Sequence, residues 1–171
     1  MVFTVIGIIL AAVFVAMVIS ILLSIFIWNP LEVGCQKFFI NCKYGNAELG
    51  DIAYGFKNGY AHIGMIMFLR GLFTGLWMLL FIIPGIVKSY EYMMIPYLLA
   101  EHPEMTRQEA FAESKQMMDG NKWDAFVLDL SFIGWTLLGV CTFGILLVFY
   151  VEPYIYLTRA ELYHALKNNN K

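Results

Sequence analysis

The sequence has few charged residues and few cysteines. Only 14% of its 171 residues are Asp, Glu, Lys or Arg, whereas about a quarter of a soluble domain is charged. The formal net charge of -2 leaves no basic face to neutralise phosphates, which argues against a nucleic-acid partner. Cys35, Cys42 and Cys141 show no metal-ligand spacing, so ordinary buried thiols are favoured over metal or redox chemistry.

The motifs of the common enzyme classes are also missing from the sequence. It contains no Walker loop, no dinucleotide glycine fingerprint, no HExxH zinc motif and no nucleophile elbow. His62, His102 and His164 lie far apart, and Glu161 with His164 supplies only two ligands on one helix face. We therefore expect a protein that is not an enzyme, with no catalytic residue, no cofactor and no metal site.

Apolar residues are abundant instead. Hydrophobic residues make up 60% of the chain and aromatic residues 16%, which is typical of a membrane protein with interfacial Trp and Tyr. No charge occurs from Val2 to Trp28, and about 20 apolar residues suffice to cross the ~30 Å hydrocarbon core. A cleaved signal peptide would have a basic segment first and a shorter apolar core. We predict a retained transmembrane helix over residues 4–28, ended by Trp28-Asn29-Pro30.

Two later apolar runs are each too long for a single span. A helix from Tyr60 to Ala100 would be ~60 Å long, about twice the thickness of the membrane. Proline removes a backbone donor and glycine adopts conformations that other residues avoid, so Pro84 and Gly85 are the expected turn of a membrane hairpin. The run from Trp123 to Ala165 poses the same problem, and Gly144 is its expected turn. The predicted hairpin arms are residues 60–83, 86–100, 123–141 and 145–166.

A short amphipathic helix is predicted between the two hairpins, over about residues 106–119. Thr106 and Glu109 form a capping box, and Gly120 is a suitable stop. Its apolar face would lie on the membrane surface or against the bundle; it comprises Ala110, Phe111, Met117 and Met118. The segment after Pro30, as far as about Asn58, is expected to be a loop with one or two short interfacial helices.

The two long runs also match each other at one offset. Gly75 aligns with Gly134 and Gly85 with Gly144, while Pro96-Tyr97 resembles Pro153-Tyr154 after a short slip. The alignment favours an internal repeat. The expected architecture is therefore one all-α transmembrane domain over residues 1–171, with about five spans arranged as one helix and two hairpins.

The positions of the basic residues predict the orientation. Every lysine and arginine except Arg70 and Lys88 falls in residues 29–59, in residues 101–122 or in the tail after Thr158. Five spans place these three segments on one side of the membrane, and that side is expected to be cytoplasmic because Lys and Arg set orientation.

Several charged residues fall inside the predicted spans. Such groups cost roughly 2.5–3.5 kcal/mol each at mid-bilayer unless they are paired or hydrated. The candidate intramembrane polar site comprises Arg70, Lys88, Glu91, Asp129 and Glu152. Arg70 and Asp129 lie at equivalent positions before their turn glycines, so we hypothesise that they pair across the hairpins, as a structural clamp or as a transport site.

The other three charges have the same two interpretations. Lys88 and Glu91 share a helix face, and with Glu152 they could line a polar cavity or relay protons. Alternatively, hydroxyls such as those of Ser89, Tyr90 and Tyr154 could satisfy them as structural groups.

Several stretches resemble a known family. "NPLEVG", "GFKNG", the segment from "FIIPGIVKSYEYMMIPY" to "GNKWD", and "SFIGW" are similar to the domain of unknown function 975 (DUF975) family over roughly residues 29–166. The resemblance implies a small integral protein of a bacterial plasma membrane. It implies no reaction and no substrate, because none is established for the family.

The function expected from these features is non-enzymatic. The first interpretation is a membrane partner or regulator in envelope stress or self-protection, acting through its cytoplasmic loops. The second is a small-solute or lipid transporter that uses Arg70, Asp129, Glu91 and Lys88, as a homo-oligomer because one small bundle leaves little room for a path. The expected partners are the lipid bilayer and another membrane protein or a second copy of the chain.

Overall fold

A computed structural model describes residues 2–142 and 144–169 of the chain. All regular structure over these residues is helical, which confirms the all-α class. The elements are α1 (Val2–Leu23), η1 (Ser24–Trp28), α2 (Asn29–Lys43), η2 (Leu49–Ala53), α3 (Tyr54–Lys57), α4 (Tyr60–Leu80), α5 (Ile82–Glu91), α6 (Ile95–Glu101), α7 (Arg107–Met117), α8 (Lys122–Ser131), α9 (Ile133–Cys141), η3 (Leu147–Val151) and α10 (Glu152–Asn169).

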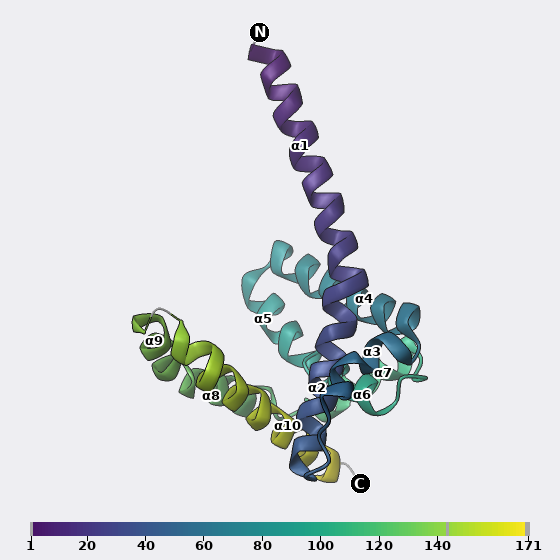
Figure 1. Cartoon of the computed structure of the whole chain (residues 1–171), viewed down its shortest axis with the longest axis vertical. Coiled ribbons are helices and arrows are strands. Elements are labelled where there is room, and N and C mark those ends of the chain that lie inside the picture. Colours follow the sequence, from purple (N-terminus) through teal and green to yellow (C-terminus); the bar gives the residue numbers. More distant parts are fainter. Residues whose placement is uncertain (1, 143, 170–171) are drawn as a thin grey trace.

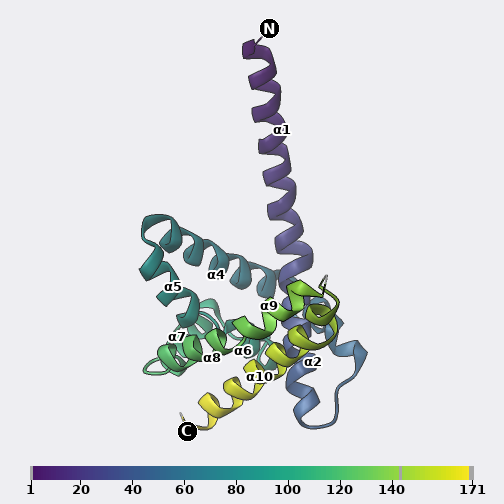
Figure 2. The ribbon, with the colours of Figure 1, turned by 90° about the vertical axis from the view of Figure 1, so that its left-hand side faces the viewer.

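Three helical stretches of the described chain are long and apolar enough to cross a membrane. They are Thr4–Lys43, Tyr60–Leu80 and Lys122–Cys141. In the first of them, α1 leaves the rest of the molecule as a single rod in both views (Figures 1 and 2), and residues 5–23 are exposed throughout. These stretches are consistent with a membrane location.

The first helix does not end at Trp28-Asn29-Pro30, which corrects the prediction made there. α1 runs through the π-helical turn η1 directly into α2. Pro30 has no N–H for the carbonyl of Phe26, its partner in an α-helix. The hydroxyl of Tyr60 donates to that carbonyl instead, at 2.7 Å, so the missing bond does not break the helix.

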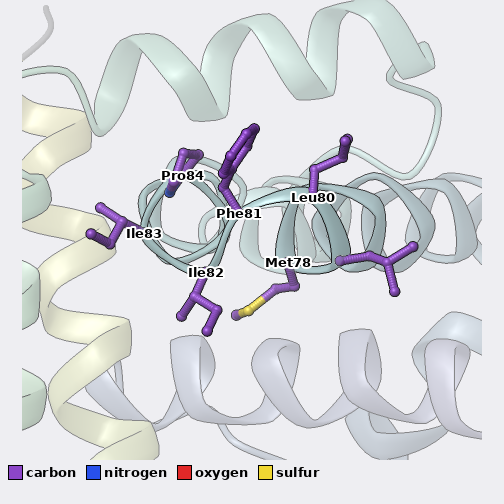
Figure 3. A pocket seen from close by; sticks show the side chains of 7 residues that line it. Met78, Leu80, Phe81, Ile82, Ile83 and Pro84 are labelled. Carbon is purple, nitrogen blue, oxygen red and sulfur yellow. The ribbon is translucent and has the colours of Figure 1, made fainter.

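The chain reverses at Phe81, and this position corrects the predicted turn at Pro84 and Gly85. Phe81 is extended (φ -152°, ψ 126°) between α4 and α5, and Figure 3 shows Met78 and Ile82 on one side of this turn. Pro84 lies in the first turn of α5, where a missing N–H breaks no helical bond. A Cβ on Gly85 would lie 2.6 Å from the Met78 Cα, so the glycine allows α4 and α5 to pack closely.

The segment expected as one span over residues 86–100 is two helices in different surroundings. α5 ends at Glu91, and a turn over residues 92–94 leads into α6. Every residue from Ile95 to Ala100 is buried, and α6 packs on α2 and α7. α6 is therefore part of the protein core and has no face for lipid.

The amphipathic helix α7 has the predicted capping box, in which the side chains and backbone amides of Thr106 and Glu109 bond reciprocally. Its apolar face packs against the core, with Ala110 and Met117 buried and Phe111 partly buried. Gly120 follows with a φ of +78°, a conformation that favours glycine.

The last third of the chain forms a second helix pair, in which α8 and α9 return through η3 and α10 (Figure 1). Gly144 lies in the turn between them with a φ of +81°, and its N–H bonds to the Gly139 carbonyl at 3.0 Å. This is the geometry with which a glycine ends a helix.

Three helices that contribute to the core begin with an X-Pro pair. Asn29-Pro30 starts α2, Ile95-Pro96 starts α6 and Glu152-Pro153 starts α10. A π-helical turn precedes the first and the third, and the turn over residues 92–94 precedes the second. α2 packs on both α6 and α10. Proline is tolerated at the start of α6 because the first turn of a helix requires no helical N–H, whereas at the start of α2 the hydroxyl of Tyr60 replaces the missing donor.

Candidate functional site

The charged residues of the predicted intramembrane site divide into separate clusters. Arg70 of α4 donates to Glu32 of α2, with 2.9 Å between Nη1 and Oε1. Asp129 of α8 accepts from Arg159 of α10, with 2.8 Å between Oδ1 and Nη2. The hypothesis that Arg70 pairs with Asp129 is therefore wrong. Equal depth along two helix pairs does not make two side chains face each other, and each charge has an opposite charge on a nearer helix.

Asp129 joins three helices. Its Oδ2 accepts from the hydroxyl of Tyr90 in α5 at 3.0 Å, while Oδ1 is bound to Arg159 in α10. Both oxygens of the carboxylate are thus engaged by donors from different elements. This arrangement favours the structural interpretation of Asp129, because the charge is neutralised and held.

Glu91 lies between two lysines. Its side chain is only 5% exposed, and it accepts from Lys88 at 2.8 Å and from Lys122 at 3.2 Å. The hydroxyl of Ser114 in α7 donates to the backbone carbonyl of Glu91 at 2.8 Å. Glu91 therefore lies where α5, α7 and α8 meet. Two ammonium groups on one carboxylate leave one positive charge in excess.

Lys88 also lies close to aromatic rings. Its Nζ is 5.9 Å from the ring centre of Trp77 and 5.6 Å from that of Tyr92. Such contacts hold a cation in an apolar setting. Glu152, by contrast, is exposed at the start of α10, and no hydrogen bond or ion pair joins its carboxylate to the rest of the described chain.

A fourth cluster was missed by the sequence reasoning. Glu101 at the end of α6 accepts from the hydroxyl of Tyr163 at 2.6 Å and also from the Nζ of Lys167, both in α10. Burial raises the pKa of Glu101, but the bonds from Lys167 and Tyr163 outweigh it, so the pKa lies below its ordinary value. The spacing of Tyr163 and Lys167 on one helix face is the only signal of this clamp in the sequence.

Polar atoms without partners lie in the same core. The hydroxyl of Tyr97, the Nε of Arg159 and the Oε1 of Gln36 are buried with no hydrogen-bond partner among the described residues. They come from α6, α10 and α2, the helices that pack together. Buried polar atoms are normally bonded, so each of these three has a hydrogen bond to offer to water or a polar guest.

The comparison with protein families identifies a match over nearly the whole chain. A family model described as a protein of unknown function (DUF975) matches residues 2–170. No curated protein and no solved structure matches the chain.

Proposed function

The chain belongs to the DUF975 family, and we propose that it is a multi-pass protein of a bacterial plasma membrane that acts as a non-enzymatic partner or regulator of another membrane protein. The observation that carries the proposal is the pairing of its charges. Arg70, Asp129 and Glu91 are each held by an opposite charge from another helix, so they tie the bundle together.

The proposed membrane arrangement has five segments, as one helix and two hairpins. The exposed apolar residues support it, because they gather on α1, around the turn at Phe81 and on α8, α9 and the start of α10. α5 has ten residues and is ~15 Å long, about half of the hydrocarbon thickness. The first hairpin therefore needs only to enter the bilayer and return to keep its two ends on one side.

The opposite end of the molecule is the proposed cytoplasmic base. It contains α2, α3, α6, α7 and the end of α10, and nearly all of the basic residues lie in or beside these elements. The excess of Lys and Arg is what orients this end towards the cytoplasm. Its solvated surface is what a partner would contact.

We also propose that the two helix pairs are copies of an internal repeat. The second arm of each pair leads into a core helix that begins with X-Pro-Tyr, at Ile95-Pro96-Tyr97 and Glu152-Pro153-Tyr154. The equivalence of Gly85 and Gly144 is looser, because the first lies within a helix and the second within a turn.

Labelling of single cysteines tests the arrangement. Asn46, Lys115 and Asn169 are exposed, and the proposal places all three in the cytoplasm. In a variant with its native cysteines changed to serine, each introduced cysteine should react with a membrane-impermeant maleimide only after the cells are opened. Labelling of Lys115→Cys and Asn46→Cys from different sides would contradict the hairpins.

Co-purification tests the function itself. The tagged chain, extracted in mild detergent from its own cells, should retain one membrane protein in stoichiometric amount. Combined substitution of the α7 surface residues Arg107, Glu113 and Lys115 by alanine should release that partner without changing the melting temperature. A chain that purifies alone, at native expression and after cross-linking, would contradict the proposal.

The second candidate function is transport of a small solute or lipid. The unpartnered buried atoms of Tyr97, Arg159 and Gln36 favour it, since a polar guest could supply the hydrogen bonds that they lack. Uptake into proteoliposomes that is lost in Glu91→Gln and Asp129→Asn would support transport. Equal uptake by these variants and by the unaltered chain would rule out a role for the charged site.

A further inference from the structure

An apolar groove runs between α5 and α8. Its volume is about 390 Å³, and it is lined by Ile83, Ile86, Val87, Tyr90, Lys122, Trp123 and Phe126. Along α5 it extends from Ile83 to Tyr90, a distance of ~10 Å. Trp123 is 71% exposed, although it is a wall of the groove. Lys122 is the only charged residue of the lining.

The wall of the groove on α8 and part of its wall on α5 are rigid aromatic rings. Phe126 makes an edge contact with Tyr90, at 6.2 Å between ring centres, and a tilted contact with Trp123 at 5.3 Å. The hydroxyl of Tyr90 is in turn fixed on Asp129. The ring contacts join α5 to α8 beside the groove, and the aliphatic side chains of Ile83, Ile86 and Val87 form the rest of its lining.

One end of the groove is cationic. Lys122 reaches Glu91 at 3.2 Å, and Lys88 reaches the other oxygen of the same carboxylate at 2.8 Å. One carboxylate cannot neutralise both ammonium groups. The side chains of Lys122 and Lys88 are 28% and 26% exposed, so the excess charge is available to an anion at the surface.

We propose that the groove between α5 and α8 binds one acyl chain of an anionic phospholipid, whose phosphate is held by Lys122 with Lys88 beside it. The proposal rests on the proposed placement of α5 and α8 in the membrane. An apolar channel that ends in a net positive charge complements an acyl chain that ends in a phosphate. The cytoplasmic leaflet carries the anionic lipids, and interfacial Trp lies at the level of their headgroups.

The groove has the chemistry for this lipid and not for a free anion. Inorganic phosphate would use the lysines alone and leave the apolar lining empty. A zwitterionic lipid would fill the lining and offer its phosphate, but the cation of its headgroup offsets that charge beside the two ammonium groups. An anionic lipid fills the lining and also brings an uncompensated negative charge.

Fluorescence quenching tests the proposal in the full chain. A variant that keeps Trp123 as its only tryptophan, with Trp28, Trp77 and Trp135 changed to phenylalanine, is reconstituted into phosphatidylcholine vesicles containing phosphatidylglycerol. Bromine is placed on the acyl chains of one lipid or the other. At equal bromine content, brominated phosphatidylglycerol should quench Trp123 more strongly than brominated phosphatidylcholine. We expect phosphatidylglycerol to occupy the groove about fivefold more, because one lysine near an anionic headgroup contributes about 1 kcal/mol.

Two further variants and one control variant locate the effect. Lys122→Gln should abolish the preference for phosphatidylglycerol. Val87→Trp should abolish it too, because the added ring fills the groove while both lysines remain. Since this variant adds a tryptophan, its bound lipid is measured by native mass spectrometry. Lys57→Gln, at an exposed lysine of α3, should leave the preference unchanged. Addition of inorganic phosphate should not restore the intensity of Trp123.

Each negative result of the quenching experiment contradicts a different part of the proposal. Equal quenching by the two brominated lipids would overturn the lipid site while leaving the membrane placement intact. No quenching by either lipid would overturn the placement of α8 in the membrane and the lipid site with it. Loss of the co-purifying partner bears only on the proposed regulatory function.

Discussion

The hydroxyl of Tyr60 donates to the backbone carbonyl of Phe26 at 2.7 Å, across the contact between α4 and the π-helical turn η1. Pro30 leaves that carbonyl without its helical donor, so a side chain from a different helix completes the backbone bonding. The Nδ2 of Asn29 donates to the Gly64 carbonyl at 3.3 Å beside it. The long first helix and α4 are thereby joined at the point where the helix would otherwise be weakest.

Removing this hydroxyl should destabilise the protein. Tyr60→Phe is expected to cost about 1 kcal/mol of unfolding free energy, because the Phe26 carbonyl loses its side-chain donor. In a Pro30→Ala background the restored N–H can reach the Phe26 carbonyl, and the same substitution should cost less. Thermal unfolding of the four proteins in detergent measures the coupling, and strictly additive effects would contradict this role of Tyr60.

The ion pair between Asp129 and Arg159 should respond to a charge swap. Arg159→Asp and Asp129→Arg are each expected to lower stability by about 2 kcal/mol, since a bonded charge loses its partner. The double variant Asp129→Arg with Arg159→Asp should recover a large part of the melting temperature. The matched control, Arg70→Asp with Asp129→Arg, should show no recovery, and recovery there would restore the pairing that the structure excludes.

Close packing at Gly85 predicts a strong effect of one methyl group. Gly85→Ala places a Cβ 2.6 Å from the Met78 Cα. A backbone atom cannot move aside as the flexible end of a side chain can. We expect a loss of about 1–3 kcal/mol. Gly75→Ala is the control, because nothing lies within 4 Å of its added Cβ. Similar melting temperatures for the two variants would contradict the close approach of α4 and α5.

The bonds from Tyr163 and Lys167 to Glu101 predict that acid lowers the stability of the cytoplasmic base of the protein. The pKa of Glu101 is depressed from its ordinary 4.5 in the folded protein, so the stabilisation is complete above that value and is lost as the pH falls towards the folded pKa. Melting temperatures measured across this range should fall more steeply with acid for the unaltered chain than for Glu101→Gln. Parallel curves would show that the bonds from Tyr163 and Lys167 add no pH dependence.

The local features of the chain were predictable from the sequence. The cap of α7 is an example, because Thr106 and Glu109 bond to each other and to the backbone within one turn. The same is true of Gly120, which needs only its own positive φ to end the segment. Local bonding and periodicity also give the all-α class, since both depend on neighbours within a few residues.

The errors occurred where a distant residue decides the local structure. The helix continues past Pro30, where the hydroxyl of Tyr60 donates to the Phe26 carbonyl. No residue near Pro30 in the sequence indicates that donor. The partners of Arg70 and Asp129 were missed because Glu32 and Arg159 lie in segments interpreted as a loop and a tail. Pairing between helices depends on how they are rotated about their axes, which hydrophobicity alone does not determine.

The unbroken helix from α1 to α2 also has a mechanical consequence. α2 is the element on which α6 and α10 pack, so α1 is joined to the centre of the core by one continuous helical backbone. The π-helical turn at Ser24–Trp28 is the irregular point of that backbone, and a bend of the exposed rod relative to the core is expected there.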